Sequence, residues 1–163
     1  MREIPYLHER GRLPRSLLSI PSLAALEGAG LDELLEDATL LECLPGDRIL
    51  REGDPSAAFY ILLRGQLIVI KGGETIAAIR EPGEIIGERS LLDREPRSAT
   101  VEAVSAALLL KVRPGFAESL DPMRRLRGEA TAFRFLAGQL ARRLADTSAR
   151  LAEKEKEPRV YRL

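Results

Sequence analysis

The sequence predicts an α+β fold that is mainly β: a small antiparallel barrel or roll, with short helices before it and one long helix after it. Three observations support this fold class. In the middle of the 163-residue chain, short apolar segments alternate with glycine and proline. Apolar side chains recur at helical spacing before and after that region. No sequence period of roughly 20–50 residues repeats, so a solenoid is not expected.

The N-terminal region is predicted to be an arm followed by a helix. Proline and glycine interrupt residues 1–15, so we expect a flexible arm there. Residues 31–38 follow the break at 28–30 and carry apolar side chains at helical spacing, which predicts a short helix. We expect one structural domain over residues 16–157, with a short tail at 158–163.

The roll is predicted to occupy residues 41–112, where turn signals separate short apolar runs. Pro45-Gly46, Gly53-Asp54-Pro55 and Gly72-Gly73 are examples of these turn signals. Several short strands at regular spacing are typical of an antiparallel barrel or roll. Five segments have the length of a strand, namely 59–63, 66–70, 75–79, 100–104 and 107–112.

The C-terminal region, residues 114–157, is predicted to be helical. Asp121 can cap a helix, with Pro122 in the first helical position. A long helix is expected over residues 129–157, ended by Pro158. Its spacing fits a straight helix better than a strict heptad, and it can pack on the roll, on a second subunit or on both. The apolar stripe of this helix consists of Phe133, Leu136, Leu140, Leu144, Thr147 and Leu151.

Composition argues against several classes of function. The formal net charge is zero, so the whole chain creates no long-range attraction for nucleic acid or an anionic membrane. Cys43 and His8 are the only cysteine and the only histidine, which argues against a disulfide framework, an iron–sulfur cluster and a zinc site. With no nucleophile–base pair or metal set in the sequence, we expect no enzyme and no cofactor. Cys43 is expected to be a small buried hydrophobic residue.

The sequence also gives expectations about location and source. The N-terminus is charged, contains Pro5 and lacks the apolar core of a signal peptide. No apolar run is long enough to cross a membrane, so the cytoplasm is the expected compartment. Arginine outnumbers lysine, and alanine and leucine are abundant, which suggests a bacterial source.

Residues 87–100 carry the chemistry of the sequence. The carboxylate of Glu88 suits a sugar hydroxyl, because it accepts a charge-assisted hydrogen bond. The guanidinium of Arg97 suits a phosphate, because its fork matches two phosphate oxygens. Gly87 permits close approach of the backbone, and residues 89–92 can form one helical turn. Ser98 and Ala99 offer backbone amides, and Ser98 adds a hydroxyl. The alternative is an ordinary salt bridge between Glu88 and Arg97 in a loop.

These residues resemble the phosphate-binding cassette of the cyclic-nucleotide-binding domain family, whose pattern is approximately F-G-E-x-A-L, a gap, and P-R-x-A-T. The chain has Ile86-Gly87-Glu88-Arg89-Ser90-Leu91 and then Pro96-Arg97-Ser98-Ala99-Thr100. The upstream family signature also has counterparts at 44–54 and 59–65. Together these motifs cover about residues 20 to 120 in the family's order. The resemblance implies a double-stranded β-helix, or jelly roll, that binds a nucleotide through Gly87, Glu88, Arg89, Ser90, Arg97, Ser98 and Ala99.

The long helix resembles the dimerisation helix of the cAMP receptor protein branch of this family. In that branch a Thr-Ser pair contacts the adenine of cAMP, one hydroxyl coming from the partner subunit. Thr147 and Ser148 occupy those positions, although they can also be simple helix-surface hydroxyls. The resemblance implies a homodimer formed through residues 129–157. The branch continues into a helix-turn-helix domain, and too few residues follow Leu151 here for a recognition helix.

The resemblance therefore implies a stand-alone cytoplasmic sensor of cAMP, or of cGMP, that signals to an effector protein and does not bind DNA or membrane itself. Arg89 departs from the family pattern, which usually has leucine or isoleucine there. Its side chain can stack on a purine, pair with a nearby acid or block the pocket. Arg89 thus leaves open a ligand-independent interaction module on the same fold. A transcription regulator that acts only with a DNA-binding partner is a further alternative.

Overall fold

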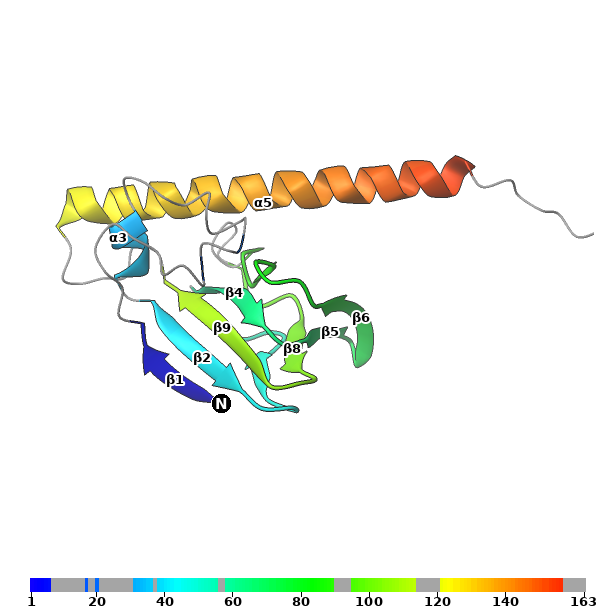
Figure 1. The fold of residues 1–163 in the computed structure, drawn as a ribbon, viewed down its shortest axis with the longest axis horizontal. Coiled ribbons are helices and arrows are strands. Elements are labelled where there is room, and N and C mark those ends of the chain that lie inside the picture. Colours follow the sequence, from blue (N-terminus) through cyan, green and yellow to red (C-terminus); the bar gives the residue numbers. More distant parts are fainter. Residues whose placement is uncertain are drawn as a thin grey trace, which may run out of the picture.

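The fold of this computed structural model is two antiparallel sheets with a long helix across one end (Figure 1). The model describes residues 1–6, 17, 20, 31–36, 38–55, 58–89, 95–113 and 121–156. One sheet has five strands in the order β1-β2-β9-β4-β7, and the other has four in the order β3-β8-β5-β6. The mainly β fold with a long C-terminal helix is confirmed.

The elements have the following bounds. The strands are β1 (Arg2–Pro5), β2 (Thr39–Cys43), β3 (Arg48–Leu50), β4 (Phe59–Arg64), β5 (Leu67–Lys71), β6 (Glu74–Ile79), β7 (Ile85–Ile86), β8 (Thr100–Ala103) and β9 (Ala107–Val112). The helices are α3 (Leu31–Leu35) and α5 (Pro122–Lys156).

The five expected strand segments correspond to β4, β5, β6, β8 and β9, each within one residue at either end. The structure adds β1, which lies in the segment that we expected to be a flexible arm. Its four residues pair antiparallel with β2, from Arg2 opposite Glu42 to Pro5 opposite Thr39. This strand lies at the edge of its sheet, where a terminal proline costs no internal ladder bond. The next strand, β2, begins at Thr39, two residues before the expected start of the roll near residue 41.

The core consists of two clusters, one between the sheets and one below the helices. The cluster between the sheets contains Leu62, Leu67 and Leu109, which are all fully buried. The second cluster packs α3 and α5 against the ends of the strands, with Phe59 and Phe135 in a tilted contact at 6.2 Å between ring centroids. Cys43 is buried and free, as its apolar neighbours suggested.

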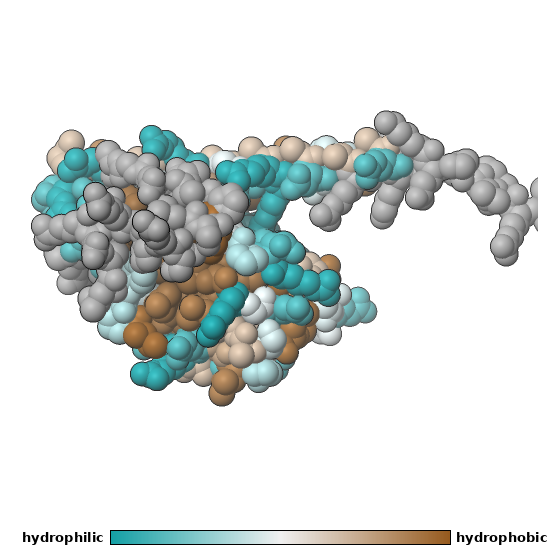
Figure 2. Space-filling model, viewed as in Figure 1, coloured by the Kyte–Doolittle hydropathy of each residue, from teal (hydrophilic) through white to brown (hydrophobic). Residues whose placement is uncertain are grey.

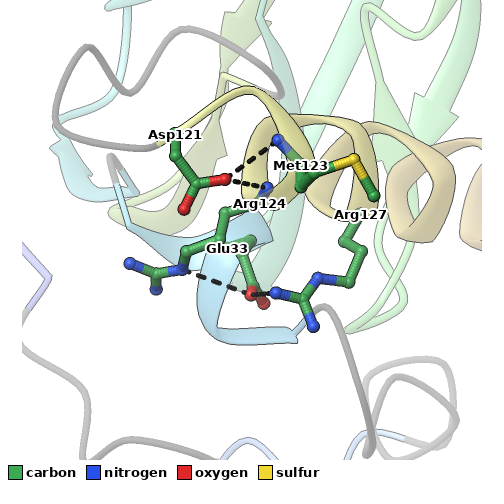
Figure 3. A network of polar contacts seen from close by, with 5 residues as sticks. All are labelled: Glu33, Asp121, Met123, Arg124 and Arg127. Carbon is green, nitrogen blue, oxygen red and sulfur yellow. Dashed lines mark hydrogen bonds and ion pairs between the residues drawn. The ribbon is translucent and has the colours of Figure 1, made fainter.

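Helix α5 begins at Pro122, seven residues before the expected start. The carboxylate of Asp121 caps it by accepting hydrogen bonds from the backbone amides of Met123 at 2.9 Å and Arg124 at 3.0 Å (Figure 3). The expected start at residue 129 was wrong, because the helix that Asp121 and Pro122 begin continues without interruption to Lys156. Gly128 lies inside this helix and allows α3 to approach, since a Cβ there would lie 3.1 Å from the carbonyl carbon of Glu33.

The carboxylate of Glu33 holds the first turns of α5 against α3. Its Oε1 lies 3.5 Å from both Nε of Arg124 and Nη2 of Arg127, and its side chain is only 9% exposed (Figure 3). Both arginines come from the start of α5, so the two ion pairs tie α3 to that end of the long helix.

Helix α5 has one buried face and one exposed apolar face. Its buried residues include Thr131, Ala132, Phe135 and Leu136, and side chains beyond Leu136 are mostly exposed. The predicted stripe is thus divided, because Leu136 packs on the roll and the other apolar residues face outward. The helix extends beyond the body of the molecule (Figures 1 and 2). The exposed apolar residues of α5 are Met123, Leu126, Phe133, Leu140, Leu144 and Leu151.

Candidate functional site

The candidate site begins where β7 ends, at a glycine that no other residue can easily replace. Gly87 has φ +79°, a left-handed conformation that favours glycine. A Cβ at this position would collide with Nη1 of Arg97 and lie 3.1 Å from Cζ of the same guanidinium. The missing side chain therefore makes room for the arginine that the sequence predicted to bind phosphate.

The backbone and side chain of Arg97 are both fixed by the roll. The Arg97 amide donates to the carbonyl oxygen of Asp54 at 2.9 Å, and its own carbonyl accepts from the amide of Gly53 at 2.9 Å. Its guanidinium donates from Nη1 to the Gly87 carbonyl oxygen and from Nη2 to the Ala58 carbonyl oxygen, both at 2.6 Å. Arg97 thus joins three separate segments of the chain around the cassette.

The Arg97 guanidinium is a buried positive charge. The residue is 5% exposed, and burial lowers the pKa of the guanidinium, while the charges of Tyr60 and Glu88 act in the opposite direction. An arginine with a lowered pKa still keeps its proton at neutral pH. The site consequently provides a fixed cation in partly dehydrated surroundings, where an anion is attracted more strongly than in water.

Glu88 is held by a residue that the sequence prediction did not include. Arg143, on α5, places Nη1 3.2 Å from Oε1 of Glu88, whose side chain is 14% exposed. The other terminal nitrogen of Arg143 donates to the carbonyl oxygen of Ile85. Arg143 lies outside the predicted apolar stripe of the helix, and nothing local in the sequence connects it with a carboxylate 55 residues away.

Arg89, the residue that departs from the family pattern, points toward an acid. Its Nη2 lies 3.4 Å from Oε2 of Glu95, with both side chains more than half exposed. Of the three roles considered for Arg89, the structure shows the pairing with a nearby acid. Arg89 also contributes to the wall of the cavity described next.

A cavity of about 280 Å³ lies between the cassette, the second sheet and α5. It brings together six of the predicted residues, Gly87, Glu88, Arg89, Arg97, Ser98 and Ala99, and adds Arg143. Apolar side chains from β3, β5, β6 and β8, including Leu50, Val69 and Val101, form much of the remaining wall. Ligand pockets commonly measure roughly 300–1,000 Å³, so this cavity is near the lower end of that range.

Three predicted residues remain. Ser90 lies outside the described residues. Thr147 and Ser148 are exposed on α5, about one helical turn beyond Arg143, and neither belongs to the cavity wall of this single chain. The described residues contain no group of three His, Cys, Asp or Glu side chains that could hold a metal ion. Within the same part of the chain, no helix combines the length and the apolar character needed to cross a membrane.

This arrangement suits an anion that also carries a hydroxyl group. Arg97 supplies the positive charge, Glu88 supplies an acceptor, and the apolar wall offers a surface for a flat ring. These groups are the ones that the cassette motif predicted. The structure places Glu88 and Arg97 in the wall of one cavity. Their roles toward a ligand stay a prediction.

Sequence comparison finds similarity to protein kinases and kinase subunits that are named for their dependence on cAMP or cGMP. The chain is 30% identical to the cAMP-dependent protein kinase regulatory subunit of Emericella nidulans over 118 residues, which is 71% of this chain and 29% of that protein. It is 48% identical to the cGMP-dependent protein kinase of Toxoplasma gondii over 59 residues, 36% of this chain and 6% of that protein. The chain therefore spans less than a third of these relatives. Both come from eukaryotes, which does not support the bacterial source that composition suggested.

Structure comparison and a family model agree with the fold. A cyclic nucleotide-binding domain from Methylobacillus flagellatus aligns with a TM-score of 0.61 at 22% identity, covering 90% of this chain and 84% of that one. The family model described as "Cyclic nucleotide-binding domain" matches residues 40–120. That match spans β3 to β9, the cassette and Arg97. Through residues 40–120, the chain belongs to the cyclic nucleotide-binding domain family.

Proposed function

We propose that this chain is a non-catalytic sensor of a cyclic mononucleotide, with cAMP as the first candidate ligand and cGMP as the second. The observation that carries the proposal is the buried guanidinium of Arg97, held by two carbonyl oxygens at 2.6 Å in the wall of the cavity. A cyclic phosphodiester bears one negative charge, which this guanidinium would pair with in partly dehydrated surroundings.

The other cavity residues fit the remaining parts of such a ligand. Glu88 would accept a hydrogen bond from the ribose 2′-hydroxyl, and the backbone at Ser98 and Ala99 would approach the phosphate. Val69 and Val101 would contact the purine on the apolar side. The names of the two curated relatives, one cAMP-dependent and one cGMP-dependent, support this ligand class and leave the base open.

The exposed face of α5 supports a homodimer. Leu126, Phe133 and Leu140 are spaced seven residues apart and are 58%, 46% and 38% exposed. Thr147 continues this row at the same interval, and Leu144 and Leu151 form a parallel row. Two such rows at heptad spacing form a coiled-coil seam when a second copy of the helix covers them. In the dimer, Thr147 and Ser148 would lie at the seam, where the family resemblance puts them next to the purine.

Charged substitutions in the two exposed apolar rows of α5 test the proposed dimer. Leu140→Glu with Leu144→Glu should produce a monomer in light scattering coupled to size-exclusion chromatography, because each seam position would bury a charge. Arg142→Glu, a charge change at an exposed position outside the two rows, should leave the mass unchanged. A monomeric wild-type protein at tens of micromolar would contradict the proposed dimer.

The proposed output is contact with an effector protein, without direct binding to DNA. A ligand can shift the equilibrium between two positions of α5. The free energy of that shift is at most the difference between the ligand's binding free energies for the two positions. The cytoplasmic location stays a prediction from the sequence.

Calorimetric titration tests the ligand class. We expect cAMP to bind the wild-type chain, cGMP to bind with equal or lower affinity, and a cyclic dinucleotide to bind more weakly than either, since the cavity of about 280 Å³ is near the lower end of ligand pockets. 2′-Deoxy-cAMP should bind about tenfold more weakly than cAMP to wild type and with no such difference to Glu88→Ala, which has no side-chain acceptor, if Glu88 recognises the hydroxyl. Absence of heat with all cyclic nucleotides would contradict the proposal.

One observation favours a second candidate, a ligand-independent interaction module. Glu88 already has a partner from α5, and both terminal nitrogens of Arg97 already donate to carbonyl oxygens. A cassette whose Glu88 and Arg97 side chains already contact other parts of the chain can serve as a scaffold that holds the helix. Under this alternative, a partner captured through α5 would bind equally well with and without cyclic nucleotide.

A further inference from the structure

The charged side chains of the cassette lie at different depths in the cavity wall. Arg97 is buried, the side chain of Glu88 is 14% exposed, and the side chain of Arg89 is 58% exposed. All three line the same cavity, so the exposed one borders its mouth. The cassette thus runs from a buried cation, through a nearly buried carboxylate, to an arginine at the opening of the cavity.

The covalent structure of a cyclic nucleotide follows the same order. The cyclic phosphate is fused to the ribose at C3′ and C5′, the free hydroxyl is at C2′, and the base is attached at C1′ on the other side of the sugar. With the phosphate at Arg97 and the hydroxyl at Glu88, the base would point toward the mouth of the cavity. Arg89 is the charged side chain of the cassette that borders this end.

We propose that Arg89 recognises the edge of the base and favours a purine with an oxygen at C6 over adenine. This inference rests on the proposed function, which assigns the phosphate to Arg97 and the ribose hydroxyl to Glu88. Guanine presents two neighbouring acceptors, O6 and N7, whereas adenine presents an acceptor at N7 and a donor at N6. A guanidinium has only donors, and its planar fork matches a pair of acceptors. The leucine or isoleucine that the family usually has at this position has no side-chain donor, so it cannot make this distinction.

The ion pair of Arg89 with Glu95 leaves the guanidinium able to turn to a base at small cost. Its Nη2 lies 3.4 Å from Oε2 of Glu95, and both side chains are more than half exposed. Exposed ion pairs of this kind contribute little free energy, because water and salt screen the two charges. Glu95 thus holds the guanidinium beside the cavity and competes only weakly with a pair of acceptors on a base.

Removing Arg89 should change selectivity with a definite sign. All the cyclic mononucleotides compared carry the same single negative charge, so a general loss of attraction cancels in the ratio of two affinities. The specific loss remains, and it should weaken purines with an oxygen at C6 relative to cAMP. The wild-type order, with the affinity for cAMP at or above that for cGMP, is unchanged, because Arg89 narrows the difference without reversing it.

Calorimetric titration with cAMP, cGMP and cyclic inosine monophosphate tests the proposal. The base of inosine has the O6 and N7 acceptors of guanine and lacks its 2-amino group, so it isolates the edge assigned to Arg89. In Arg89→Leu, the affinities for cGMP and cyclic inosine monophosphate should fall about five- to tenfold relative to the affinity for cAMP. Arg64→Leu, which removes an exposed arginine outside the cavity wall, should keep the wild-type ratios. Glu95→Gln removes the competing carboxylate and should shift the ratios about twofold in the opposite direction.

Other patterns of affinity in Arg89→Leu would overturn the assignment. An equal loss for all three ligands would indicate stacking of Arg89 on the purine face or a general attraction, and an equal gain would indicate that Arg89 obstructs the cavity. A loss confined to cGMP would indicate recognition of the 2-amino group instead of O6 and N7. Binding with unchanged ratios would refute this inference alone. Absence of binding by wild type and by every variant would refute the proposed function, and the inference with it.

Discussion

Replacing Gly87 by alanine tests the geometry of the cassette through two separable costs. An alanine in the left-handed conformation of Gly87, φ +79°, costs about 1–2 kcal/mol. The new Cβ would also collide with Nη1 of Arg97 and displace it from the Gly87 carbonyl oxygen. Losing a hydrogen bond from a charged donor costs a further ~1.5–3 kcal/mol. We therefore expect Gly87→Ala to lower the free energy of unfolding by about 2.5–5 kcal/mol.

Gly46, in the turn between β2 and β3, provides a matched control. It has a similar φ of +87°, yet a Cβ there would meet nothing within 4 Å. Gly46→Ala should cost only the conformational part, about 1–2 kcal/mol. Both variants would be unfolded in urea under identical conditions, and both would be titrated with cAMP. Gly87→Ala should bind about 10- to 150-fold more weakly than wild type if the displaced Arg97 holds the phosphate, because 1.4 kcal/mol is one factor of ten.

The result that would refute this reasoning is equal behaviour of the two variants. If Gly87→Ala is no less stable than Gly46→Ala and keeps the wild-type affinity for nucleotide, Gly87 does not position Arg97. The collision between the added Cβ and the guanidinium would then be relieved by a movement that leaves the site intact.

Three further predictions concern the fold. Asp121→Ala should lower the free energy of unfolding by about 1 kcal/mol, and Asp121→Asn should recover most of it, because the carboxylate caps α5 by accepting from Met123 and Arg124; equal losses for both variants in urea unfolding would contradict a capping role. Phe135→Ala should cost about 3–5 kcal/mol by leaving a cavity against Phe59, whereas Phe133→Ala on the exposed face should cost far less at concentrations where the chain is monomeric. Burial raises the pKa of the Cys43 thiol from 9.0 to about 11, so between these pH values the unfolded chain has lost a proton that the folded chain keeps. The free energy of unfolding should therefore fall as pH rises from 9 to 11, by at most about 1.4 kcal/mol per pH unit from this group. The fall should be smaller in Cys43→Ala, and an equal pH dependence of the two proteins in denaturant unfolding would contradict a raised thiol pKa.

Local sequence signals predicted much of this fold. The strands β4 to β6, β8 and β9 have apolar runs bounded by turn residues, and these signals lie within the strands themselves. The cassette was predictable for the same reason, because its glycine, acid, arginine and small residues lie within fourteen positions. Gly87 and Arg97 meet across only ten residues.

The features that the sequence did not predict depend on contacts between distant segments. The strand β1 is charged and ends in proline, and only its pairing with β2 makes it a strand. Gly128 serves the close approach of α3 to a continuous α5, and no signal within the helix sequence reveals that contact. Arg143 has the pattern of a solvated helix face, and its contact with Glu88 appears only when the helix lies across the roll.

The measurement that tests the central claim most directly is the affinity of wild type and Arg97→Ala for cAMP, determined by calorimetry on the same day and in the same buffer. The account predicts saturable one-site binding by wild type. For Arg97→Ala it predicts a loss of at least about 100-fold, because the phosphate would be left in the cavity without its buried cation. Circular dichroism would confirm that the variant keeps its secondary structure. Equal affinities of the two folded proteins, or no binding by wild type, would contradict the claim that this cassette holds a cyclic phosphate.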